Sequence, residues 1–214
     1  MSPDVTMDVS VHHVDDNGTV KELHRASGGP WGVACVSNTF IALLTQIFGK
    51  DIMMKLKDDD VEAYSELLQT IQTKLSQVYS LVDRNTKYTV RIPVSLVVMF
   101  EKITKEDVST KIENLHLKDD IECLSPSKLR VSAKVVLSWF QAPINNGIGH
   151  LSGILSDPSM NDVDTIILVG EFAKCPLLKT AVKEAFMNKT IVIPKYPEQA
   201  VLSGAVVCGH QGNK

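Results

Sequence analysis

A short apolar run late in the chain limits the folds that this sequence can adopt. Residues 164–170 read Asp-Thr-Ile-Ile-Leu-Val-Gly, with no charged side chain after the first position. Such a run is typical of a central strand that helices cover on both faces. Pro176 then opens an amphipathic helix, and residues 190–193 have the composition of a further strand. This order of strand, helix and strand predicts an α/β fold with a mixed sheet flanked by helices.

The N-terminal region predicts a β-hairpin. Apolar and polar side chains alternate from Val5 to His12, which is the period of a strand with one buried face. Asp-Asn-Gly at residues 16–18 favours a tight turn, because asparagine and glycine tolerate positive φ. The second strand is expected at residues 19–26, and the glycine-rich residues 27–32 are expected to form a flexible loop.

The middle of the chain is mainly helical by its apolar spacing. We therefore divide the chain into a sheet-containing core, residues 1–49 and 125–214, and an inserted subdomain of helices and a small sheet, residues 50–124. Further helices are expected at residues 33–48, 50–57, 61–82, 94–103, 106–114, 133–155 and 197–208. Further strands are expected at residues 87–92, 121–124 and 128–132.

Proline, threonine and glutamate suggest details at the helix ends. Pro143 and the Asn-Asn-Gly that follows it predict a break in the long helix, because proline cannot donate a backbone hydrogen bond. Thr104 is a candidate N-cap for the helix expected at 106–114. Glu198 is expected near the N-terminus of the last helix, where the helix dipole stabilises a negative charge.

Composition argues against several classes of protein. The 214 residues are 44% apolar and 22% charged, as in a globular protein, and the net charge of -3 disfavours a nucleic-acid-binding protein. No apolar run approaches the roughly 18 residues of a membrane span. Four widely spaced cysteines predict neither a disulfide framework nor a metal site, and residues 1–10 show no signal-peptide pattern. These features predict a cytoplasmic protein with no membrane or nucleic-acid partner.

Several positions could hold a ligand. Asp8, on the first strand, could orient a hydrated magnesium ion, although a solvent-facing aspartate is the simpler interpretation. Gly28 and Gly29 could expose N–H groups to phosphate, or could only form the turn that leads into the next helix. Gly170 follows the apolar run, at the place where α/β sheets bind ligands. Glu171 beside it fills the space that a second glycine would leave open.

These motifs occur in an order that resembles one family. The chain is similar to the C-terminal lobe of the actin-like ATPase domain of seventy-kilodalton heat-shock proteins, and within that family it resembles the 12A/12B-like branch. The resemblance extends over nearly the whole chain. The matching stretches are residues 6–12, 21–32, 90–93 with 99–100, 128–132 and 162–210.

The resemblance implies a ribonuclease-H-like lobe with an inserted helical subdomain and a cleft for ATP or ADP with magnesium. In the family, phosphate is gripped by one hairpin from each of two lobes. The first hairpin, and the lysine and glutamate used for hydrolysis, would lie upstream of this chain, so we assign no catalytic residue. The resemblance places Asp8 near the metal, through water. It implies cofactor contacts at Thr6, Asp8, Gly28, Gly29, Gly170, Lys174 and Glu198.

The chain departs from the family pattern at several positions. The second phosphate hairpin normally reads Asp-x-Gly-Gly-Gly-Thr-x-Asp, and residues 1–8 keep only its Thr6 and Asp8. Asp4 and Val5 would add negative charge and bulk where phosphate binds. The family's charged adenosine contacts on the inserted helix align with Gln72, Leu75 and Ser76.

We therefore expect a truncated or degenerate ATP-binding lobe of a chaperone ATPase that does not hydrolyse ATP by itself. The alternative is a non-catalytic protein-interaction module, a pseudo-ATPase that retains only the fold. A third interpretation is an unrelated α/β protein that binds a nucleotide or sugar phosphate. Without the other lobe, cleft surface would be exposed, so we also expect a protein partner or self-association over that face.

Overall fold

The computed structural model describes the backbone of residues 5–78 and 86–211, and the side chains of these residues except 72–78. Helices and small sheets alternate along the chain, so the structure is α/β, as predicted. The chain divides into two compact units. The first unit comprises Met1–Cys35 and Gln141–Lys214, and the second comprises Val36–Phe140.

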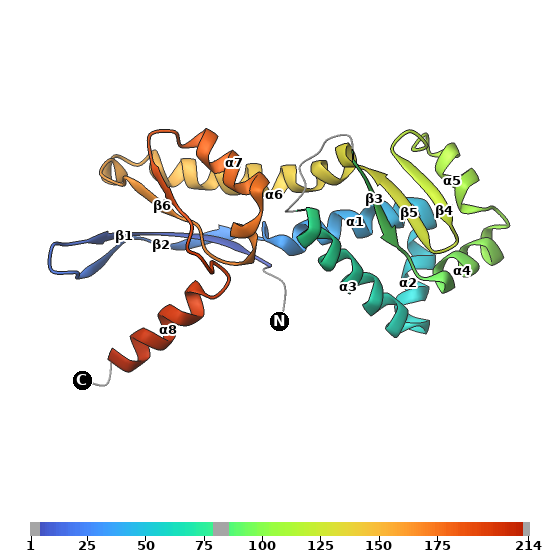
Figure 1. Ribbon diagram of the computed structural model, residues 1–214, viewed down its shortest axis with the longest axis horizontal. Coiled ribbons are helices and arrows are strands. Elements are labelled where there is room, and N and C mark those ends of the chain that lie inside the picture. Colours follow the sequence, from blue (N-terminus) through green and yellow to red (C-terminus); the bar gives the residue numbers. More distant parts are fainter. Residues whose placement is uncertain (1–4, 79–85, 212–214) are drawn as a thin grey trace. The chain divides into compact units, whose positions relative to one another are not determined.

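The limits of the two units fall inside helices. Both α1 (Val33–Phe48) and α6 (Ala133–Leu155) contain one of these limits (Figure 1). The subdomain predicted at residues 50–124 lies within the second unit, whose limits are farther out along the chain in both directions.

The predicted hairpin is present in the first unit. Strands β1 (Met7–Val14) and β2 (Val20–Gly29) pair in antiparallel fashion. Gly18 has a φ of 79°, and the Asp15 carboxylate accepts two backbone hydrogen bonds across the turn. The side chains of β1 alternate as predicted as far as Val11, which is buried.

The prediction of a loop at residues 27–32 is wrong for its first half. Residues 27–29 continue β2 and pair with residues 7–9 of β1. A Cβ atom at Gly28 would overlap the carbonyl oxygen of Met7. Glycine is therefore used here for the close approach of two strands, not for loop flexibility.

Helix α6 is continuous through Pro143, although the sequence predicts a break there. Pro143 and Ile144 are both buried. One turn later, a Cβ atom at Gly147 would overlap the side chain of Met7 from β1. The packing of this part of the helix therefore outweighs the loss of the proline N–H.

The apolar run at residues 164–170 forms a shorter and more exposed strand than predicted. Strand β6 (Thr165–Ile167) pairs in parallel with β7 (Thr190–Val192). Ile166 is buried, but Ile167 is 61% exposed, so the prediction of a strand covered on both faces is wrong. The described strands form three small sheets instead of one mixed sheet, because β6 pairs with β7 alone.

Short helices complete the first unit. Helix α6 ends before Asp157 and Pro158, as predicted, and Asp157 caps the following turn through the N–H of Ser159. The last helix begins three residues later than predicted. The elements are η1 (Pro158–Met160), η2 (Glu171–Lys174), α7 (Pro176–Ala185) and α8 (Ala200–Gln211).

The second unit contains the remaining helices and a three-stranded antiparallel sheet of order β3-β5-β4. Asp60 accepts a hydrogen bond from the N–H of Ala63 and so caps the N-terminus of α3. Asp107, and not Thr104, caps α5. The elements are α2 (Lys50–Asp59), α3 (Val61–Val78), β3 (Lys87–Arg91), α4 (Val94–Thr104), α5 (Val108–Asn114), β4 (Ile121–Ser125) and β5 (Lys128–Ser132).

The largest fully buried side chains among the described residues all belong to the second unit. Phe48 packs edge to face on Phe100, with ring centroids 5.5 Å apart. The first unit contains a cluster of Val11, Ile154 and Met160 between the hairpin and the end of α6. On α8, more than half of each of four large apolar side chains is exposed, namely Val201, Leu202, Val206 and Val207.

Within the part of the chain that the structure describes, no single helix has both the length and the apolar character needed to cross a membrane. Helices α1 and α2 meet the criterion only as a pair, and the pair is bent by 111°. Both α1 and α2 contain buried residues.

Gly28→Ala should destabilise the protein by about 1–3 kcal/mol, as overpacked substitutions typically do. The added Cβ would force β1 and β2 apart at Met7. Gly209→Ala is the matched control, because a Cβ there meets nothing within 4 Å. The control should be neutral or slightly stabilising. Chemical denaturation measures both variants, and equal losses would contradict the close strand approach.

Two cysteines should differ in reactivity. Cys175 is buried, and burial raises the pKa of its thiol, whereas Cys208 is exposed on α8. Because the thiolate is the reactive form, iodoacetamide should modify Cys208 in the native protein and Cys175 only after denaturation. Timed alkylation followed by peptide mapping measures both rates. Similar native-state rates would show that Cys175 is accessible or that Cys208 is covered.

Candidate functional site

The predicted contacts of the N-terminal region lie together at the end of the hairpin away from its turn. Thr6 Oγ1 donates a hydrogen bond to Asp8 Oδ2 at 2.7 Å, and both side chains are exposed. Gly28 lies opposite Asp8 across the strand pair. A Cβ atom at Gly29 would overlap the ring of Trp31. The two glycines therefore serve close packing, and their contact with phosphate stays a prediction.

The other predicted contacts lie at the carboxyl ends of the parallel strands β6 and β7. Gly170 follows β6 with a φ of 88°, a conformation that favours glycine. Its N–H donates to the carbonyl oxygen of Pro197 at 2.8 Å and so joins the segments that follow the two strands. Glu198 lies in the turn before α8, not in the helix as predicted. This edge of parallel strands is where α/β proteins commonly bind ligands.

Lys174 contacts two carboxylates in this second group. Its Nζ lies 3.0 Å from Glu171 Oε2 and 3.4 Å from Glu198 Oε2. The hydrogen bond with Glu171 is the main reason that the pKa of Lys174 is above its ordinary value. Glu198 Oε2 is buried and accepts no hydrogen bond from the described residues, so its longer contact with Lys174 is an ion pair alone. The three side chains carry two negative charges and one positive charge.

Metal binding has limited support in the structure. Residues 5–71 and 86–211 contain no group of three histidine, cysteine, aspartate or glutamate side chains that could hold a metal ion. A contact from Asp8 through water needs only one carboxylate, because Mg²⁺ usually keeps several waters. That contact stays a prediction. The side chains of Gln72, Leu75 and Ser76, the aligned adenosine positions, are outside the described residues.

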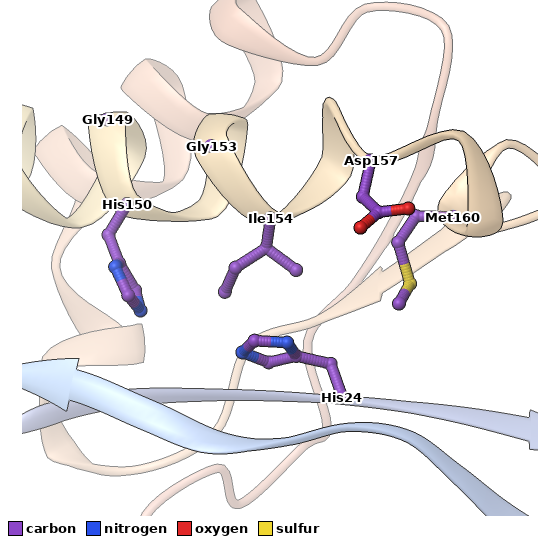
Figure 2. A pocket seen from close by; sticks show the side chains of 7 residues that line it. All are labelled: His24, Gly149, His150, Gly153, Ile154, Asp157 and Met160. Carbon is purple, nitrogen blue, oxygen red and sulfur yellow. The ribbon is translucent and has the colours of Figure 1, made fainter.

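A pocket in the first unit was not predicted from the sequence. It has a volume of about 440 Å³ and lies between β2 and the end of α6. Figure 2 shows His150, Ile154 and Met160 pointing toward the strand that carries His24. Its lining residues are His24, Gly149, His150, Gly153, Ile154, Asp157 and Met160.

Two imidazole rings meet at one hydroxyl group beside this pocket. Ser27 Oγ lies 2.8 Å from His24 Nε2 and 3.0 Å from His150 Nε2. The ring of Trp31 lies against His150, with centroids 5.4 Å apart. His24 and Ser27 are three residues apart, so a regular strand would place them on opposite faces. Their side chains meet because the pairing is irregular here, with two residues of β2, Arg25 and Ala26, opposite Ser10 of β1.

Asp157 lies at the other end of the pocket. Hydrogen bonds from the hydroxyl and the N–H of Ser159 hold the pKa of its carboxyl below the ordinary value, and the charge of His24 acts in the same direction. Asp157 is therefore ionised at neutral pH. Sequence spacing gave no signal for this pocket, because its residues come from a strand, a helix and the turn that follows the helix.

Comparison with known proteins tests the resemblance. No family model matches the chain. Over 206 residues, which is 95% of this chain, it is 31% identical to heat shock 70 kDa protein 12A of Mus musculus and 30% identical to the protein of the same name from Homo sapiens. It is 30% identical over 207 residues to human heat shock 70 kDa protein 12B. The chain spans about 30% of the length of these curated relatives. The resemblance inferred from the motifs is thus confirmed, and nearly the whole chain is similar to part of the 12A and 12B heat shock 70 kDa proteins.

Proposed function

We propose that this chain is a degenerate nucleotide-binding lobe of a heat-shock-70-like ATPase, with a ribonuclease-H-like core, and that it does not hydrolyse ATP by itself. The similarity to heat shock 70 kDa proteins 12A and 12B supports the family assignment in this proposal. The inserted subdomain at residues 50–124, a chaperone role and a cytoplasmic location are parts of the same proposal.

The observation that carries the proposal is the grouping of the predicted contacts in the first unit. Thr6, Asp8 and the two glycines gather at one end of the hairpin. Gly170, Lys174 and Glu198 gather at the carboxyl ends of β6 and β7. The fold thus brings residues that are far apart in the sequence into two compact groups. Each group lies where a pair of strands ends.

The same two groups explain why we expect no hydrolysis. Phosphoryl transfer depends on cations and N–H donors that converge on the phosphates. Among the described residues of the two groups, Lys174 supplies the only positive charge, and Glu171 and Glu198 compete for it. Val5 stands where the family has a glycine of the phosphate hairpin, and its side chain is exposed.

Asp8 is the residue that fits hydrated magnesium. Its carboxylate is exposed, and Thr6 holds one of its oxygens by a hydrogen bond. In this proposal magnesium would supply charge neutralisation for the phosphates of a bound nucleotide. Asp8 would then orient water molecules of the ion, and Thr6 would fix the rotamer of Asp8.

ATP with magnesium should raise the melting temperature of the purified chain, and Asp8→Asn should abolish that rise. A ligand present at a hundred times its dissociation constant stabilises the folded state by about 2.7 kcal/mol. Differential scanning fluorimetry and calorimetry measure the effect. Asp16→Asn is the matched control, because Asp16 is an exposed aspartate at the turn of the same hairpin.

The outcomes separate the parts of the proposal. A rise that survives in Asp16→Asn but not in Asp8→Asn supports nucleotide binding at the hairpin. Turnover of ATP above a blank, lost in Asp8→Ala, would contradict the absence of hydrolysis. No heat and no thermal shift in the wild-type chain would favour the second candidate function.

The second candidate is a non-catalytic protein-interaction module. Helix α8 favours it, because a helix with apolar side chains all around normally lies buried. Here its large apolar side chains are mostly exposed. Such a surface suits a protein partner or self-association.

Leu202→Glu should weaken any self-association without unfolding the chain. Leu202 is 65% exposed, so the substitution costs little packing in the monomer. Sedimentation at several concentrations should show association of the wild-type chain and a monomeric variant. Ser203→Glu, on the same helix, controls for added charge. If the wild-type chain stays monomeric at all concentrations, self-association through α8 is contradicted. The candidate partner of α8 would then be a different protein.

A further inference from the structure

The pocket between β2 and α6 has no part in the proposed nucleotide site. None of the residues that line it is among the predicted nucleotide contacts. Its volume of about 440 Å³ lies within the range of small-molecule sites, which is about 300–1,000 Å³. It also has the usual composition of such sites, with apolar walls and a few convergent polar groups.

The two histidines that line the pocket share the hydroxyl group of Ser27, which lies beside the pocket, and a bound anion would change how the three groups share their protons. A serine hydroxyl has one proton to donate and two lone pairs that accept. When Ser27 donates its proton to one imidazole, that proton is unavailable to a ligand. When both rings donate from Nε2, Ser27 accepts twice and its own proton is free. An oxyanion favours the second arrangement, because it can then accept from Ser27.

Protonation of the two rings forces this second arrangement, because an imidazolium has a proton on each nitrogen. Histidine changes its charge between about pH 5 and 8. Asp157 is the charged group that faces His24 across the pocket, and no other charged side chain lines the pocket among the described residues. With both rings protonated, the pocket carries a net positive charge. Anion binding and proton uptake are therefore coupled.

The remaining walls suit an aliphatic group. Ile154 and Met160 are buried apolar residues of the first unit, and both border the pocket. Gly149 and Gly153 leave the helix side open, because a Cβ at either position would meet nothing within 4 Å. Figure 2 shows Ile154 on the same side of α6 as His150, and Met160 on the η1 segment that follows the helix. A ligand with one charged end and one short apolar end would match both parts.

We propose that this pocket binds a small aliphatic carboxylate, held at its charged end by Ser27, His24 and His150 and at its apolar end by Ile154 and Met160. The two imidazoles make binding dependent on pH. Asp157 at the far end disfavours a second carboxylate on the ligand, so the site prefers a monocarboxylate to a dicarboxylate.

The test uses sodium 4-methylpentanoate as the probe and the full chain as the protein. Titration followed by NMR of the histidine side chains should show saturable shifts of His24 and His150. Binding should be about tenfold weaker at pH 8 than at pH 6, because an anion favours the imidazolium form, which has a proton on each ring nitrogen. Inorganic phosphate, which has no apolar end, and 4-methylpentan-1-ol, which has no charge, should each bind more weakly.

Three variants locate the binding. Gly153→Leu should fill the pocket and abolish binding, while the better helix propensity of leucine keeps α6 intact. His150→Gln should weaken binding about tenfold at pH 6 and reduce the pH dependence, because only His24 then remains as a titratable imidazole at the pocket. His13→Gln is the matched control, since His13 is an exposed histidine of the same hairpin that does not line the pocket.

The titrations of the wild-type chain and its variants either support or overturn the proposed carboxylate site. Saturable binding that survives in His13→Gln and disappears in Gly153→Leu supports the proposal. No saturable shift in the wild-type chain would overturn it and would leave the His24–Ser27–His150 group as a structural link between β2 and α6. Equal binding in wild type and Gly153→Leu would also overturn it, because the probe would then bind elsewhere. Neither result bears on nucleotide binding, which is tested separately through Asp8.

Discussion

The close approach of β1 and β2 at Gly28 is the contact on which the first unit depends. No side chain other than hydrogen fits against the carbonyl oxygen of Met7, so this pairing is tied to glycine. The pairing places Asp8 opposite Gly28 and directs Met7 to the surface of α6 at Gly147. A one-residue slip would move each of these side chains to the other face of the hairpin.

Charge distribution distinguishes the two places in the first unit that could take an anion. At the ends of β6 and β7, Lys174 already contacts Glu171 and Glu198. An incoming phosphate would have to compete with both carboxylates. The pocket between β2 and α6 is lined by two histidines and by Asp157, and the Asp157 carboxylate accepts hydrogen bonds from Ser159. Exposed ion pairs contribute little to stability, so the contacts of Lys174 with Glu171 and Glu198 affect anion binding more than they stabilise the fold.

Local patterns predicted the elements whose stability is local. The alternation up to Val11, the turn at Gly18 and the apolar spacing of α1 all appear in the structure as predicted. The errors fall where distant parts of the chain meet. Pro143 is accommodated inside α6, where it is buried together with Ile144, and residues 27–29 are strand because β1 lies beside them.

The sequence by itself determined the order of helices and strands, the hairpin, and the resemblance to the 12A and 12B heat shock proteins, because these depend on residue type and spacing along the chain. Only the tertiary structure decided that the apolar run would pair on one side alone, and that His24, Ser27 and His150 would meet. A strand's pairing partners and a bulge that turns a side chain to the other face are set by contacts between segments, and spacing within one segment does not contain that information.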